Sequence, residues 1–175
     1  NKIFKNKIYK IFINIFFGIY LYFFYFLLVN IKNEFNEELI LILLTTCILS
    51  DLGGYIIGKS IGGTKLTAIS PNKTISGAIG AIIFTLIGTP LFVNLINNIL
   101  NDKIEFEYSA IFFIWLIIMS IFCQIGDLLF SYLKRKANIK DTGNILPGHG
   151  GVLDRVDGII FAIPFGFLTY FILIL

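Results

Sequence analysis

The chain has 175 residues, of which 57% are hydrophobic, with a mean hydropathy of +0.86 and a formal net charge of +3. This length indicates a single domain, and so high a hydropathy excludes an ordinary soluble protein. The small net charge, and polar loops without interleaved basic and aromatic residues, give no reason to expect a nucleic-acid partner.

Five apolar runs are each long enough to cross a bilayer core, which needs about 20 residues in a helix. They are Ile8 to Val29, Leu39 to about Ile57, Ile75 to Leu100, Tyr108 to about Tyr132, and Val156 to Leu175. The first run is too long for a signal peptide and has no small-residue cleavage site after it. The sequence therefore predicts an all-α, polytopic integral membrane protein with about five transmembrane helices.

The charges between the runs alternate in sign along the chain. Lysine-rich segments precede the first run and lie between runs two and three and between runs four and five, whereas the other two loops are acidic. Short loops rich in lysine and arginine stay in the cytoplasm. We therefore expect the N-terminus inside, the C-terminus outside, and the polar stretches 50–77 and 124–157 at the cytoplasmic face of the membrane.

Carboxylates gather at the predicted cytoplasmic ends of the apolar runs. Asp51 and Asp127 follow apolar residues, and Asp154 and Asp157 begin the last run. Ionisable residues in membrane spans are functional candidates by default, and oxygen ligands without a histidine cluster suit Mg²⁺ better than Zn²⁺. The simpler alternative is that these aspartates cap helices or pair with Arg155 and the lysines.

Glycine-rich loops and basic residues lie in the same stretches. "PGHGG", "IGGTK" and "SPNKTISG" offer backbone N–H groups, hydroxyls and lysines that suit phosphate oxygens, although each signal alone is weak. Carboxylates for a divalent cation beside phosphate-binding loops at a cytosolic surface indicate phosphoryl or nucleotidyl transfer. Cys47 and Cys123 lie inside apolar runs, where we expect small core side chains rather than a disulfide or a metal site.

Two motif regions resemble the phosphatidate cytidylyltransferase (CDP-diacylglycerol synthase) family. "SYLKR" followed by "KDTGNILPGHGGVLDRVD" is similar to the family signature, and "GD" at Gly126 and Asp127 matches the element ahead of it. Upstream, the stretch from Asp51 to Gly58 is similar to "DxGAYxxG", and "SPNKTISG" to "SPxKTxEG". Ser76 departs from that last pattern, since an acidic residue is common there.

This resemblance implies an enzyme that joins CTP and phosphatidic acid to give CDP-diacylglycerol and pyrophosphate, with Mg²⁺ as cofactor. It implies that Asp127 and Asp154 are metal ligands, followed by Asp157 and Asp51, and that Asp127, Asp154, Lys140 and Arg155 are catalytic. The residues that it implies hold phosphate or nucleotide are Ser70, Lys73, Ser131, Lys134, Arg135, Asp141 and His149.

The resemblance covers the chain from about Asp51 onward, so we assign residues 1–50 to an N-terminal helix and the start of the second span, and residues 51–175 to the catalytic transmembrane domain. The chain begins at Asn1 and its only methionine is Met119, from which we expect it to be part of a longer protein. The expected partners are the two substrates and membrane lipids, with a homodimer left open.

Two alternatives to this function are kept. A related CTP-using enzyme acting on an isoprenoid or archaeal-type lipid would use the same metal and phosphate chemistry. A membrane transporter could line an ion path with aspartates, but such a path needs charges spread across the membrane depth, and here they cluster at one face.

Overall fold

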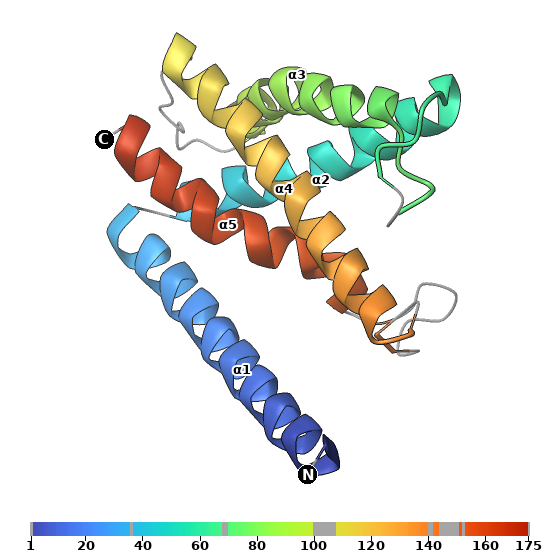
Figure 1. The fold of residues 1–175 in the computed structure, drawn as a ribbon. Helices are drawn as coiled ribbons and strands as arrows, with labels where there is room; N and C mark the ends of the chain where they lie inside the picture. Colours follow the sequence, from blue (N-terminus) through green and yellow to red (C-terminus); the bar gives the residue numbers. More distant parts are fainter. Residues whose placement is uncertain are drawn as a thin grey trace. The chain divides into compact units, whose positions relative to one another are not determined.

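A computed structural model describes residues 2–35, 37–67, 70–99, 108–139, 142–143, 151 and 153–174; for residues 2–10, 13, 35, 37 and 153–155 it describes the backbone alone. The helices are α1 (Lys2–Phe35), α2 (Glu37–Ile61), α3 (Ile75–Ile99), α4 (Ala110–Lys136) and α5 (Leu153–Leu173) (Figure 1). All five are long and apolar enough to cross a membrane. The prediction of an all-helical integral membrane protein is confirmed.

The helices extend further into the polar segments than the apolar runs indicated. α4 continues through Lys134, Arg135 and Lys136 because cations are favourable at the carboxyl end of a helix. Its start is capped by Ser109, whose Oγ accepts a hydrogen bond from the backbone N–H of Phe112 at 3.3 Å.

The chain divides into two compact units, Asn1–Ile40 and Leu41–Leu175. In the first unit the middle of α1 is apolar, and its large exposed side chains include Phe12, Phe16 and Tyr22. Only 11% of its spanning segment is buried, which fits a helix whose side chains contact lipid. The assignment of a catalytic domain to residues 51–175 stays a prediction.

In the second unit α2 and α3 pack through glycines. A Cβ atom at Gly80 would lie 2.4 Å from the Cβ of Ile57, and one at Gly53 would lie 2.6 Å from the carbonyl oxygen of Gly80. Small residues let transmembrane helices approach closely enough for their backbones to touch. This contact fixes α3 beside the half of α2 that carries Asp51.

α4 crosses α2 and packs along α5 (Figure 1). The crossing with α2 is made by Ser50 and Ser120, whose hydroxyls lie 2.9 Å apart. Along α5 the indole N–H of Trp115 donates to the carbonyl of Gly166 at 2.9 Å. These contacts bring the carboxyl-terminal halves of α2 and α4 to the same end of the unit.

Candidate active site

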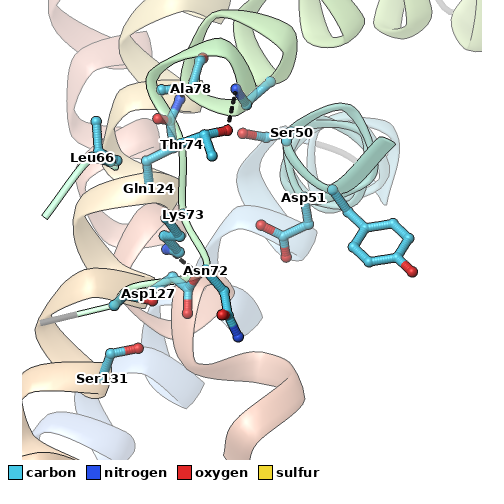
Figure 2. Close-up of a pocket in the computed structure, with 15 residues that line it drawn as sticks. Ser50, Asp51, Leu66, Asn72, Lys73, Thr74, Ala78, Gln124, Asp127 and Ser131 are labelled. Carbon is cyan, nitrogen blue, oxygen red and sulfur yellow. Dashed lines mark hydrogen bonds and ion pairs between the residues drawn. The ribbon is translucent and has the colours of Figure 1, made fainter. Parts of the chain in front are cut away.

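A cavity of about 330 Å³ opens between α2, the loop after it, the first turns of α3, and α4 (Figure 2). This volume lies at the lower end of the range for small-molecule sites. The side chains lining it that carry polar groups are Ser50, Asp51, Tyr55, Ser70, Asn72, Lys73, Thr74, Gln124, Asp127 and Ser131.

The loop between α2 and α3 folds back over the cavity. Gly62 and Gly63 turn the chain with φ of 65° and 109°, a conformation that favours glycine. Lys65 and Thr74 then form an isolated antiparallel bridge. Thr74 caps α3, its Oγ accepting a hydrogen bond from the backbone N–H of Gly77 at 3.1 Å. The loop thereby holds Lys73 at the cavity wall.

Ser76 explains how this chain accommodates its departure from the motif. Its hydroxyl donates to the carbonyl oxygen of Gly62 and lies 3.0 Å from the hydroxyl of Thr74. A carboxylate at this position could not donate a hydrogen bond to the Gly62 carbonyl. Ser76 therefore ties the start of α3 to the turn that ends α2.

Lys73 and Asp127 form an ion pair across the cavity, and both side chains are partly exposed to it. Figure 2 shows Asp51 of α2 and Asp127 of α4 facing the same space, with Ser131 one turn further along α4. Asp127 also interacts electrostatically with Asp51 and Asp157. The site thus combines acidic groups that attract a cation with a lysine that attracts phosphate.

Gln124 is fixed at the inner wall by two hydrogen bonds. Its Nε2 donates to the carbonyl of Ala78 at 3.3 Å and to the hydroxyl of Ser120 at 3.4 Å. Ser120 in turn contacts Ser50. This chain of polar contacts joins α2, α3 and α4 beside the carboxylates, since Ser50 precedes Asp51 and Gln124 lies one turn before Asp127.

The structure brings together five of the predicted site residues, namely Asp51, Ser70, Lys73, Asp127 and Ser131. Lys134 and Asp157 do not line the cavity; instead Lys134 Nζ donates to Asp157 Oδ2 at 3.3 Å between α4 and α5. Arg135 is exposed in the last turn of α4.

For the remaining residues that the sequence assigned to the site, the assignment stays a prediction. Lys140, Asp141 and His149 lie outside the described residues, and for Asp154 and Arg155 the structure describes only the backbone, in the first turn of α5. Sequence reasoning did not assign Ser50, Tyr55, Asn72 or Gln124 to the site. For Gln124 a signal exists, because it lies three residues before Asp127 on the same helix face.

The groups facing the cavity that could bind a metal are carboxylates, hydroxyls and side-chain amides. Their oxygen atoms suit a hard cation such as Mg²⁺. Among the side chains that the structure describes, no three His, Cys, Asp or Glu residues stand close enough to hold a metal ion. The oxygen donors that line the cavity fit magnesium, and Asp51 and Asp127 are the described carboxylates among them that could contribute to such a site.

Comparison with known proteins gives consistent matches. The model of the cytidylyltransferase family matches residues 2–173. Proteins named phosphatidate cytidylyltransferase are similar to this chain: that of Helicobacter pylori (strain J99) is 39% identical over 150 residues, covering 85% of this chain and 53% of the relative. That of Bacillus subtilis (strain 168) is 44% identical over 127 residues, covering 72% of this chain and 44% of the relative.

The corresponding protein of Rickettsia bellii (strain RML369-C) is 44% identical over 135 residues, covering 76% of this chain and 58% of the relative. The chain thus spans about half the length of the curated relatives it matches. The family resemblance predicted from the motifs is confirmed.

Proposed function

Because this chain belongs to the cytidylyltransferase family, we propose that it transfers the cytidylyl group of CTP to phosphatidic acid, giving CDP-diacylglycerol and pyrophosphate. The observation that carries this proposal is the cavity in which Lys73 faces Asp127 and Asp51. The names of the relatives supply the substrate pair, since those proteins are phosphatidate cytidylyltransferases.

In this reaction a phosphate oxygen of the lipid attacks the α-phosphorus of CTP, and the bond to pyrophosphate breaks. The attacking oxygen is already anionic, so a strong general base is not required. The main barrier is the approach of two polyanions, which positioned positive charges lower. Lys73 is suited to this role because its ion pair with Asp127 is partly exposed and an incoming phosphate can replace the carboxylate.

We propose magnesium as the cofactor, held by Asp127 and Asp51 with Asp154. Asp157 would join these ligands only by leaving its contact with Lys134. A bound magnesium ion would neutralise charge on the phosphate oxygens. Asp127, which pairs with Lys73, is one of the carboxylates that would hold the metal, and the Lys73 ammonium would contact the phosphates of the nucleotide. We further propose that Lys134, Arg135, Lys140, Asp141, His149 and Arg155 assist at the phosphates, with Lys140 and Arg155 in catalytic roles.

The proposed orientation places this cavity at the cytoplasmic side of a bacterial-type plasma membrane, with the N-terminus inside and the C-terminus outside. It is supported by the basic residues in the last turns of α2 and α4, at the ends of those helices nearest the cavity. CTP would arrive from the cytosol and phosphatidic acid from the surrounding lipid. A homodimer stays a prediction.

The experiment is to reconstitute the protein in vesicles with CTP labelled at the α-phosphate and to measure transfer of label into lipid. We expect labelled CDP-diacylglycerol only when phosphatidic acid and magnesium are both present. Matched vesicles containing an isoprenoid phosphate or an archaeal-type lipid acid test the alternative substrates. Label transferred to those lipids but not to phosphatidic acid would overturn the proposed substrate.

A further inference from the structure

The chain's only two cysteines meet where α2 crosses α4. Cys47 and Cys123 are each 1% exposed and free, and their Sγ atoms lie 2.9 Å apart, with the Cys123 thiol donating to the Cys47 sulfur. Sequence spacing gives no sign of this contact, because the two residues are 76 positions apart. The sequence indicated only two small core side chains, whereas the structure places the two thiols in direct contact.

The surrounding crossing is built from small side chains. Ser50 and Ser120 lie one turn from the two cysteines on the same helices and are hydrogen-bonded at 2.9 Å. Small residues at a crossing allow close backbone approach in a membrane. The thiols therefore meet between two closely packed helices rather than at the ends of flexible segments.

A metal ion is a poor explanation for the pair. Structural zinc sites use four ligands. In the described part of the chain no third histidine, cysteine or carboxylate joins a group that could hold a metal. A covalent bond between the two sulfurs requires no further ligand.

The position of the pair connects it to the cavity. Asp51 follows Cys47 by four residues and Asp127 follows Cys123 by four, so each carboxylate lies about 6 Å along its helix from the thiol contact. α2 and α4 form opposite walls of the cavity. A bond between the cysteines would limit how far these walls can separate when a ligand enters.

We propose that Cys47 and Cys123 are a thiol–disulfide switch that clamps α2 to α4 and weakens nucleotide entry when oxidised. The oxidant is an apolar disulfide able to enter the bilayer. One cysteine sulfur attacks it and releases one reagent thiol; the second cysteine sulfur then displaces the other reagent thiol and the Cys47–Cys123 bond forms. Both cysteine protons end on the two released thiols, so atoms and electrons balance.

The covalent step is tested by counting thiols on the vesicle-reconstituted protein treated with 4,4′-dithiodipyridine. We expect each chain to release two pyridine thiols and retain no reagent mass, and peptide mapping to show Cys47 joined to Cys123. Cys47→Ala and Cys123→Ala should each release one pyridine thiol and keep one pyridine group. The number of thiols released is read when the reaction is complete, because both sulfurs are buried and react slowly. A parent protein that retains pyridine groups, or loses no thiols, would overturn the proposal without relying on any variant.

The effect on the site rests on the proposed function and is measured separately. We expect oxidation to raise the KM for CTP about tenfold, within the range typical of coupling between two sites. A membrane-permeable phosphine should restore the parent value. The double variant Cys47→Ala/Cys123→Ala should keep the untreated KM and not respond to the oxidant.

The two failures are distinguishable. If the disulfide forms but the KM is unchanged, the switch is refuted and the cytidylyl transfer stands. If the untreated protein transfers no label from CTP to any lipid, the proposed function fails, while the thiol count still tests the disulfide.

Discussion

Two lysine–aspartate pairs each have one member on α4, and they differ in their surroundings. In the cavity the side chains of Lys73 and Asp127 are 26% and 33% exposed. Between α4 and α5 the side chains of Lys134 and Asp157 are 15% and 8% exposed, and Asp157 Oδ1 also accepts the backbone N–H of Gly158 at 2.9 Å. The exposed pair can exchange partners with a ligand, whereas the buried pair is already satisfied by protein.

Exposure, rather than residue type, therefore separates the pair that can bind a ligand from the pair that packs between helices. A buried pair loses much of its Coulomb gain to desolvation, but removing one partner strands the other charge. An exposed pair contributes little to stability, so little free energy is needed to separate its two charges. The following predictions use matched substitutions in the two pairs.

The largest expected effect is from Asp127→Asn, which keeps the side-chain shape and removes the charge. Losing a carboxylate that we propose as a magnesium ligand should remove about 3–4 kcal/mol of transition-state stabilisation, or two to three orders of magnitude in turnover. Label transfer in vesicles measures it. Glu34→Gln, an exposed carboxylate on α1, is the control and should behave like the parent. Near-parental turnover of Asp127→Asn at limiting magnesium would remove Asp127 from the site.

Asp157→Asn makes the same chemical change in the buried pair. It removes the carboxylate charge that the Lys134 ammonium contacts between α4 and α5. Losing one partner of a buried ion pair is destabilising, so we expect the free energy of unfolding to fall by about 3 kcal/mol. Thermal unfolding in detergent measures it. Lys136→Met, at an exposed residue near the same helix end, should leave the unfolding temperature almost unchanged. If Asp157→Asn kept the parental stability but lost its dependence on magnesium, the packing role would be wrong and Asp157 would be a metal ligand.

Lys73→Met removes the positive charge of the cavity pair and keeps most of the aliphatic stem. A charge-assisted contact with phosphate contributes about 1.5–3 kcal/mol, so we expect the KM for CTP to rise at least tenfold with little change in unfolding temperature. Steady-state kinetics across CTP concentrations measure it. Lys65→Met, an exposed residue of the same loop, is the matched control. Identical kinetics for both variants would mean that Lys73 serves only membrane orientation.

Ser76→Ala is expected to have the smallest effect. It removes the hydroxyl that bonds the Gly62 carbonyl and thereby loosens the loop that carries Lys73. One neutral hydrogen bond is worth about 1 kcal/mol, so the KM for CTP should rise about fivefold. Ser60→Ala, exposed on α2, should show no such rise. An equal rise in both would indicate a general loss of packing rather than a loop effect.

The helices could be predicted from the sequence because membrane spans depend mainly on length and hydropathy, and all five runs are helical. Asp51, Lys73 and Asp127 could be predicted as neighbours because charge alternation placed their segments at one membrane face. Lys134 lies seven residues after Asp127 and therefore on the same face of α4, yet its ammonium pairs with Asp157 of α5. Spacing along one helix predicts which residues share a face. It does not predict which neighbouring helix packs against that face.

The cysteine contact was beyond sequence reasoning for the same reason. Cys47 and Cys123 each fit an apolar run, and only the crossing of α2 with α4 brings them together. The same crossing places Ser50 and Gln124 at the cavity wall. Their residue types alone are ordinary for transmembrane helices, where serine and glutamine bond between helices.

Photolabelling with an azido derivative of CTP tests the central claim most directly, namely that CTP binds in the cavity between α2, the 62–74 loop and α4. The expected result is label on peptides containing Asp51, Lys73 or Asp127, blocked by excess CTP and reduced by Lys73→Met. Label that excess CTP blocks but that is confined to peptides outside the cavity walls, such as those of α1, would contradict it.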